Sequence, residues 1–276
     1  MNTNNNLSNE NIIHKHVDNV KYIQFRKLLE YENIISHAYT LKMDNTSFRT
    51  LNDKEKEMTT NNYKQLCREL DLDYNNIVKC SQTHTDNIKI VNKKINKNKP
   101  DINTEEYNNT DGLITNKKEI ILGTTNADCI LFLIFDPINK VIANVHSGWR
   151  GTLKEIVVKT ITKMHEYYNS NYEDIICCIC PSIRVCHFEV EKEVKDLFYN
   201  KFNYLQNINN IIIPKSNNKY NIDTILLNIT LLLNLGLKEK NITDSGICSV
   251  CNQDKINSYR ADKSNYQLST AIITLK

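Results

Sequence analysis

The chain has little charge imbalance, no apolar run of membrane length and no leader pattern, and each absence excludes a class of protein. Its 35 basic and 32 acidic residues leave a formal net charge of +3, which does not point to nucleic acid or a membrane surface as a partner. The longest apolar runs, at 130–135 and 225–237, are too short or too interrupted by Asn and Thr to span a bilayer. The polar start MNTNNNLSNENII has neither the charged nor the apolar segment of a signal peptide, so we expect a cytoplasmic protein.

The chain also lacks the even cysteine count of a secreted disulfide framework, because it has nine cysteines. We therefore expect free thiols in a reducing compartment. Cys177, Cys178 and Cys180 lie in an apolar run, where strand alternation sends neighbouring side chains to opposite faces, and we interpret them as buried thiols. Cys248 and Cys251 form a CxxC that could serve redox chemistry or zinc. No second pair lies at zinc-ribbon spacing, and we interpret this pair as structural.

Apolar and amphipathic segments alternate along the chain and predict a mixture of strands and helices. The 276 residues, 40% of them hydrophobic, suffice for a sizeable core. Residues 1–20 resemble a polar arm, and no repeat or linker divides the rest, so we predict a single domain over residues 21–276. The polar segment 92–112, which ends in the turn signal Asp111-Gly112, is predicted to be an exposed loop. Strands are predicted at 33–41, within 77–91, and at 119–129, 130–136, 140–146, 173–183, 245–251 and 269–275, and helices at about 53–70, 147–168, 189–202 and 222–237.

Three potential metal ligands stand at the ends of predicted strands. His84 lies in a polar segment between two extended runs, Cys129 precedes the run at 130–136, and His146 closes the next strand. Strand ends are places where a rigid sheet presents side chains into a cleft. Two imidazoles and one thiolate suit zinc, and three protein ligands leave a fourth position for water or substrate. Zinc bound in this way would lower the pKa of a bound water toward neutrality.

Two residues beside these ligands are candidate catalytic residues. Asp128, which precedes Cys129, could orient a ligand or move a proton, and Arg150 could hold an anionic group. The residues alone leave another interpretation open. In that interpretation His84 and His146 are hydrogen-bonded core or turn histidines, and Cys129 is a small buried hydrophobe.

Three motifs, in this order, resemble those of the YfiH/laccase-domain family. Residues 82–84 match its Gln-x-His motif, residues 127–129 match Ala-Asp-Cys, and residues 146–151 match His-x-Gly-Trp-Arg-Gly completely. The resemblance runs from about residue 37 to the C-terminus. Members of this family were once labelled multicopper polyphenol oxidoreductases and are now regarded as purine nucleoside phosphorylases.

The resemblance implies an α+β fold in which a sandwich-like core of mixed β-sheets is flanked by helices, similar to the YfiH-like cysteine hydrolase fold. It implies that His84, Cys129 and His146 bind a catalytic zinc ion, with copper as the other metal to consider. It further implies a transferase that cleaves adenosine, inosine, guanosine or methylthioadenosine with phosphate, and a hydrolase activity that deaminates adenosine. A purine nucleoside and phosphate are then the partners, without nucleic acid or membrane.

Three further residues lie in segments that match the family and are expected to bind substrate: Lys42, Gln82 and Arg260. Lys42 stands where the family has arginine, which keeps the charge but loses the bidentate fork. Arg184 replaces a family glycine, and Tyr266 replaces a family arginine. Because these changes fall at anion-handling or tight-turn positions, an altered substrate range or weakened phosphorolysis stays open.

Other functions are compatible with the same residues. A cysteine hydrolase or deamidase would use Cys129 as nucleophile and His146 as base. Copper-dependent phenol oxidation is disfavoured, because one His-Cys-His site lacks the several copper centres that such chemistry requires. A non-catalytic metal-binding member of the family would keep the ligands and lose the substrate-binding residues.

Overall fold

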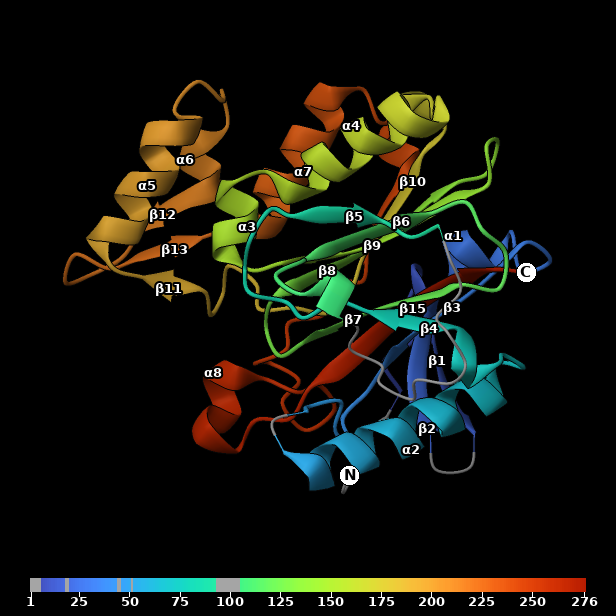
Figure 1. The fold of residues 1–276 in the computed structure, drawn as a ribbon. Coiled ribbons are helices and arrows are strands. Elements are labelled where there is room, and N and C mark those ends of the chain that lie inside the picture. Colours follow the sequence, from blue (N-terminus) through green and yellow to red (C-terminus); the bar gives the residue numbers. More distant parts are fainter. Residues whose placement is uncertain (1–5, 18–19, 44–45, 51, 93–104) are drawn as a thin grey trace.

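The structure is a computed structural model that describes residues 6–17, 20–43, 46–50, 52–92 and 105–276. Within these residues, two six-stranded sheets and a three-stranded sheet carry helices on their outer faces (Figure 1). The α+β class with mixed sheets and flanking helices, which the sequence predicts, is therefore confirmed. In the part of the chain described, no helix is long and apolar enough to cross a membrane.

The first sheet has the strand order β1-β2-β3-β15-β7-β4. Its strands pair antiparallel except β4, which lies parallel to β7. The last strand of the chain, β15, lies between β3 and β7, so segments far apart in sequence share hydrogen bonds. The strands are β1 (Ile12–Val17), β2 (Val20–Phe25), β3 (Ile35–Thr40), β4 (Ile77–Lys79), β7 (Ile121–Asn126) and β15 (Ser269–Leu275).

Strand β1 lies within the segment 1–20, which its polar composition predicts to be an arm. Residues 1–5 and 18–19 are outside the described residues, whereas Ile12–Val17 pair with β2 at the edge of the first sheet. Ile12 is fully buried, and the later residues of β1 are increasingly exposed. An edge strand with one partner tolerates polar residues, which explains why composition alone conceals it.

The second sheet has the strand order β14-β10-β8-β9-β6-β5, and its central strand β8 is buried along its whole length. Alternate side chains of β8 enter different cores, as expected for a strand covered on both faces. Leu131, Leu133 and Phe135 pack toward the first sheet, and Ile130, Phe132 and Ile134 pack toward the helices. The strands are β14 (Ile242–Asp244), β10 (Ile176–Ile179), β8 (Ile130–Asp136), β9 (Val141–Ser147), β6 (Gly112–Thr115) and β5 (Ile88–Ile90).

Helices cover the outer faces of both sheets. Helices α4 (Ile156–Tyr168) and α7 (Thr224–Leu235) pack on the second sheet, and α2 (Asp53–Glu69) packs on the first (Figure 1). The helix predicted at 147–168 is two helices, α3 (Trp149–Leu153) and α4. Glu155 between them has a φ of 60°, a left-handed conformation that a continuous helix does not contain. The short helix α1 (Arg26–Leu29) follows β2.

A smaller layer lies to one side of the sandwich, beyond α3 (Figure 1). It consists of the antiparallel strands β11 (Glu189–Val190), β13 (Tyr220–Ile222) and β12 (Ile212–Pro214) with helices α5 (Lys192–Phe202) and α6 (Ile208–Ile211). Side chains of this layer pack against α7 and form a core of their own. The last helix, α8 (Tyr259–Asp262), precedes β15.

The apolar cysteine cluster follows the predicted pattern. Cys177 packs in the core beneath the helices, whereas Cys178 and Cys180 pack in the core between the sheets. Burial raises the pKa of all three thiols far above the ordinary value. All nine cysteines are free thiols in the structure, and the interpretation of these three as buried thiols is confirmed.

Candidate metal centre

Three segments bring the predicted ligands to one edge of the second sheet. Cys129 immediately precedes β8, His146 lies near the end of β9, and the register of these two strands places Leu131 opposite His146. His84 comes from the loop between β4 and β5. One ligand atom from each of the three side chains lies within 4.8 Å of the others, and His84 Nε2 is 3.7 Å from Cys129 Sγ. The structure thus places the three residues together.

A buried carboxylate, Asp111, organises this cluster. It accepts hydrogen bonds from the backbone N–H groups of Thr83, His84 and Thr85, at 3.3, 3.1 and 2.7 Å. Its Oδ1 also accepts a bond of 2.8 Å from His146 Nδ1. The Asp111 side chain is 0% exposed. Removing the carboxylate would therefore leave each of these donors buried without a hydrogen-bond acceptor.

These bonds fix the backbone and the tautomer of the two histidines. His84 has a φ of 61°, in the left-handed region that non-glycine residues rarely adopt, and the three N–H bonds to Asp111 hold the loop there. Because His146 Nδ1 donates to Asp111, its Nε2 is left to face Cys129 and His84. Metal-binding histidines ordinarily donate their second N–H to a carboxylate in this way.

The charged groups of the cluster shift one another's pKa values. Burial alone would raise the pKa of Cys129, but the neighbouring His146 and His84 lower it to about 6. Burial alone would lower the pKa of His146, but Cys129 and Asp111 raise it to about 9. The pKa of Asp111 falls to about 2, because hydrogen bonds from His146 and Thr85 outweigh its burial. A thiolate at neutral pH is the form in which cysteine binds a metal.

Gly148 lies against the side chains of His84 and Cys129, where a larger residue would not fit. A Cβ atom added at this position would lie 2.5 Å from His84 Cδ2 and 3.2 Å from Cys129 Sγ. The φ of Gly148 is −65°, so its backbone conformation is open to any residue and the requirement for glycine is one of contact. The three ligands and the carboxylate that orients them therefore fit a zinc ion, and the absence of a side chain at residue 148 leaves the ligands in position.

The cluster opens into a cavity of about 810 Å³. Five aromatic residues contribute to its wall. Among the described residues, the basic side chains that line it are Lys79, Arg150 and Arg260. The aromatic residues are Phe48, Trp149, Phe188, Tyr259 and Tyr266, together with the two imidazoles of the cluster, and the apolar wall is completed by Ile130, Ile183 and Leu268.

The sequence of the chain matches a known protein family over most of its length. The family model described as multi-copper polyphenol oxidoreductase laccase matches residues 36–276. The chain belongs to this family. The YfiH/laccase-domain resemblance drawn from the three motifs is thereby confirmed.

Relatives in the family carry two kinds of enzyme name. A protein of Bacteroides thetaiotaomicron named purine nucleoside phosphorylase is 31% identical over 56% of this chain and 57% of its own length. A protein named adenosine deaminase RL5, from an unknown prokaryotic organism, is 28% identical over 71% of this chain and 73% of its own length. The chain spans between 53% and 59% of the length of several such relatives. The names support an enzyme at the level of the family.

A solved structure shows the same fold. The crystal structure of YlmD from Geobacillus stearothermophilus has a TM-score of 0.82 and 21% sequence identity to this chain. It covers 96% of this chain and 99% of the solved chain. At this identity the likeness concerns the fold alone.

The predicted catalytic residues of this family member lie at the cavity with different partners. Asp128 accepts a hydrogen bond from Ser249 Oγ and one of 2.6 Å from the backbone N–H of Arg260. Both of its oxygens are thus engaged, which suits an orienting role better than proton transfer. Arg150 is exposed and stacks on the Trp149 ring, with its guanidinium carbon 4.1 Å from the ring centroid. The catalytic roles of Asp128 and Arg150 stay predictions.

The three predicted substrate-binding residues occupy different places. Gln82 lines the cavity, but its amide exchanges two 2.7 Å bonds with the backbone of Thr125 and thereby ties its loop to β7. Arg260 lines the cavity. Lys42 is not among the residues that line it, and its Nζ forms an ion pair of 2.9 Å with Asp262, in the same helix as Arg260. Their roles in substrate binding stay predictions.

Asp111 is the site residue that the sequence did not reveal. The Asp111-Gly112 pair is predicted as the end of an exposed loop, and that prediction is wrong for its final residues. Thr110 and Asp111 are fully buried, and Gly112 begins β6; residues 93–104 of the predicted loop are outside the described residues. An Asp-Gly turn pattern carries no signal that distinguishes a solvated turn from a buried ligand-orienting carboxylate.

Lys79 is an unusual lining residue because its ammonium group is buried. The side chain is 5% exposed, its Nζ lies 4.8 Å from the centroid of the Tyr63 ring, and none of the described carboxylates forms an ion pair with it. Burial lowers its pKa from 10.5 to about 8. The unfolded chain therefore binds more protons between pH 8 and 10.5, so the stability of the wild-type protein should rise across that range.

We expect Lys79→Met to raise the free energy of unfolding below pH 8 by up to about 3 kcal/mol, since the buried charge is removed. The gain should shrink toward zero by pH 10.5, where the lysine of the wild-type protein is neutral when folded. Urea unfolding of both proteins at pH 7, 9 and 10.5 measures the difference. Lys89→Met removes an exposed charge from β5 and serves as the control. A gain that is the same at all three pH values would contradict the assignment.

Proposed function

We propose that the chain is a zinc-dependent purine nucleoside phosphorylase that acts on adenosine, inosine, guanosine or methylthioadenosine and also deaminates adenosine. The observation that carries the proposal is the convergence of His84, Cys129 and His146 at the mouth of a cavity with aromatic and basic walls. The names of the relatives support the same two reactions. Copper is the other metal that this donor set can hold.

The basic side chains of the cavity suit phosphate. Phosphorolysis requires a phosphate oxygen to attack the anomeric carbon of ribose while the carbon–nitrogen bond to the base breaks. Arg150 and Arg260 can hold phosphate oxygens through charge-assisted hydrogen bonds. Lys79 is protonated below pH 8 and has no carboxylate partner among the described residues, so an anion would find its charge unneutralised.

The aromatic side chains suit a purine. Trp149, Phe188, Tyr259 and Tyr266 offer flat apolar surfaces at the cavity wall, on which a base can stack. Tyr266 stands where the family has arginine, and the guanidinium carbon of Arg49 lies 4.6 Å from the centroid of its ring. The change from arginine to Tyr266 therefore replaces a charged side chain at the cavity wall with an aromatic ring that makes a cation–π contact with Arg49.

Zinc held by the triad would supply Lewis-acid polarisation and a water of lowered pKa. The chain's own residues set the conditions for that chemistry. Asp111 fixes the orientation of His146 and the loop of His84, and Asp128 joins the segment that bears Cys129 to the backbone of Arg260. The base that leaves in phosphorolysis must gain a proton, which the polarised cluster can provide or relay.

Product analysis tests the proposal. Purified zinc-loaded protein incubated with adenosine and phosphate should release adenine and ribose 1-phosphate, and it should release inosine and ammonia through deamination. Omitting phosphate should stop adenine release and leave deamination intact. Failure of the zinc-loaded protein to convert any of the four nucleosides would overturn the proposal.

A cysteine hydrolase or deamidase is favoured by one specific observation. Asp111, His146 and Cys129 form a carboxylate–imidazole–thiol series in which the pKa of the thiol is lowered to about 6. This is the arrangement of a nucleophile activated by an oriented base. His84 has no part in such a series, whereas it is the third ligand of the metal site.

The variant His84→Ala separates the two functions. We expect it to lose zinc and to reduce nucleoside turnover by at least about 100-fold, because even the loss of a residue that only hydrogen-bonds to a metal ligand costs up to about that much. If the protein is instead a cysteine hydrolase, the His84→Ala variant should keep its hydrolase activity. Iodoacetamide should then alkylate Cys129 in the wild-type protein as isolated. Zinc content, turnover and the site of alkylation are the three measurements.

A further inference from the structure

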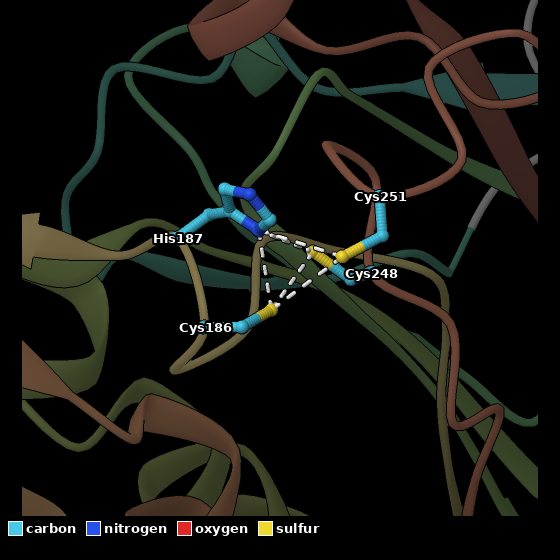
Figure 2. Close-up of side chains that lie close together, drawn as sticks. All are labelled: Cys186, His187, Cys248 and Cys251. Atoms are coloured by element: carbon cyan, nitrogen blue, oxygen red, sulfur yellow. Dashed lines mark hydrogen bonds between the residues drawn. The ribbon is translucent and has the colours of Figure 1, made fainter.

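A second cluster of metal-binding side chains lies apart from the three residues of the first. Cys186 and His187 come from the loop between β10 and β11, and Cys248 and Cys251 come from the loop between β14 and α8. One ligand atom from each of the four lies within 4.8 Å of the others. Figure 2 shows the three sulfur atoms and His187 Nδ1 pointing toward a common centre.

The distances within the cluster are those of a tetrahedral metal site. Cys186 Sγ lies 3.5 Å from Cys248 Sγ and 3.7 Å from Cys251 Sγ. His187 Nδ1 lies 3.2, 3.7 and 3.5 Å from the sulfur atoms of Cys186, Cys248 and Cys251. Zinc bonds of about 2.3 Å to sulfur and about 2.0 Å to nitrogen place tetrahedral ligands about 3.8 Å (S to S) and about 3.5 Å (N to S) apart.

The same distances do not describe disulfides. A disulfide joins sulfur atoms about 2.05 Å apart, and the cysteine pairs of this cluster are well beyond that length. Cys186 and Cys251 are exposed, and Cys248 is buried, so three free thiols and an imidazole converge near the surface. Such a group of donors, left without a metal, would be open to oxidation.

Backbone contacts hold the two loops in this arrangement. Ser182 N–H donates to the Ile247 carbonyl at 3.3 Å, and Ser249 N–H donates to the Ser182 carbonyl at 3.0 Å. The Arg184 guanidinium forms a bidentate ion pair with Asp244, with distances of 2.9 and 2.7 Å. The ligands are therefore brought together before any metal binds.

We propose that Cys186, His187, Cys248 and Cys251 bind a second zinc ion, with a structural role. Three thiolates and one imidazole are a ligand set that zinc commonly takes in structural sites. Four protein ligands leave no open position for water or substrate, in contrast to the three ligands of the first cluster. This proposal does not depend on the proposed function of the first site.

The second site is joined to the wall of the cavity. Arg260, which lines the cavity, donates from its guanidinium to the His187 carbonyl at 2.9 Å. Ser249, inside the CxxC turn, donates to the carboxylate of Asp128, the residue before Cys129. Phe188, beside His187, also lines the cavity. A zinc ion that fixes both loops would therefore hold Arg260, Asp128 and Phe188 in place.

The metal content of four purified proteins tests the proposal. Wild-type protein should hold two zinc ions, and Cys251→Ser should hold one, since one of four ligands is lost. Cys129→Ala should also hold one, because it removes a ligand of the first site only. Cys67→Ala changes a buried thiol of α2 that belongs to neither cluster and should hold two.

A conservative variant separates ligand loss from misfolding. Cys251→His keeps a donor at this exposed position and should restore the second zinc ion, whereas Cys251→Ser should not. Loss of zinc from the two variants alike would overturn the role of residue 251 as a ligand. Two ions in Cys251→Ser, or none in Cys129→Ala, would overturn the second site.

Cobalt provides a measurement on the wild-type ligand set. Cys129→Ala protein loaded with cobalt should show the intense sulfur-to-cobalt charge-transfer absorption of three thiolates. Adding Cys251→Ser to it should abolish that absorption. A mass lower by two hydrogen atoms in the native protein, with no cobalt absorption, would instead identify a disulfide and overturn the proposal.

Discussion

Asp111→Asn should reduce the affinity of the first site for zinc by about 10- to 100-fold, with a parallel loss of nucleoside turnover at limiting zinc. The carboxylate accepts bonds from the loop of His84 and from the His146 ring, and an amide offers one acceptor and one donor in place of two acceptors. With a chelator present, the free energy of unfolding should fall by about 3 kcal/mol, because buried donors lose their partner. Zinc titration and urea unfolding measure the two effects.

Asp136→Asn is the matched control for this variant. Asp136 is also fully buried, and it accepts bonds from the backbone of Ile138 and Asn139 in the turn at the far end of β8. This control should lower stability and leave the affinity for zinc unchanged. Equal zinc affinities in wild-type and Asp111→Asn proteins would show that the carboxylate does not position the ligands.

Gly148→Ala should abolish zinc binding at the first site while the protein stays folded. The added methyl group would lie 2.5 Å from His84 Cδ2, closer than van der Waals contact, and 3.2 Å from Cys129 Sγ. The backbone at residue 148 accepts alanine, so the clash must displace the ligands themselves. Turnover should fall by at least about 100-fold, because a displacement of about 1 Å in a catalytic group alone costs about that much.

Gly151→Ala, within helix α3 and three residues after Gly148, is the corresponding control. A Cβ atom there would meet its nearest neighbours at 3.4 Å, which is close to ordinary contact. Circular dichroism, zinc content and turnover should all stay near the wild-type values for this variant. If Gly148→Ala keeps its zinc and its turnover, then His84 and Cys129 do not occupy the places described.

Most of the strands and the main helices could be predicted because their signals are local, but the strand predicted at 245–251 is wrong, since that segment is a loop between β14 and α8. The unbroken apolar run of β8 indicates a strand buried on both faces, and the structure divides its side chains between two cores. Gly236, with a φ of 112°, ends α7 at the predicted position. Strand β1 and the break at Glu155 were not predicted, because edge pairing and a single left-handed residue leave little trace in composition.

The first site was predicted only in part, because its parts come from distant segments. The motifs indicate His84, Cys129 and His146, which lie at strand ends. Asp111 is 27 residues from His84 and 35 from His146, and no local pattern links a buried acceptor to donors so far away. Only the fold brings them together.

The ligands that join the CxxC at Cys248 and Cys251 also could not be predicted from local sequence. Spacing rules look for a second CxxC, whereas the partners here are the adjacent pair Cys186 and His187, 62 residues before Cys248 in the case of Cys186. An adjacent Cys-His pair is not a metal-binding pattern in an isolated segment. It becomes one when the loops after β10 and β14 pack side by side.

The rate of adenine release from adenosine and phosphate, followed as zinc is returned to metal-free protein, tests most directly whether the His84, Cys129 and His146 site carries the reaction. Metal-free wild-type protein should be inactive, and its rate should rise with added zinc. Cys129→Ala protein, which keeps the second cluster, should stay at background at every zinc concentration. A metal-free wild-type protein that retains its full rate, or a Cys129→Ala protein that zinc activates equally, would contradict the role assigned to these three ligands.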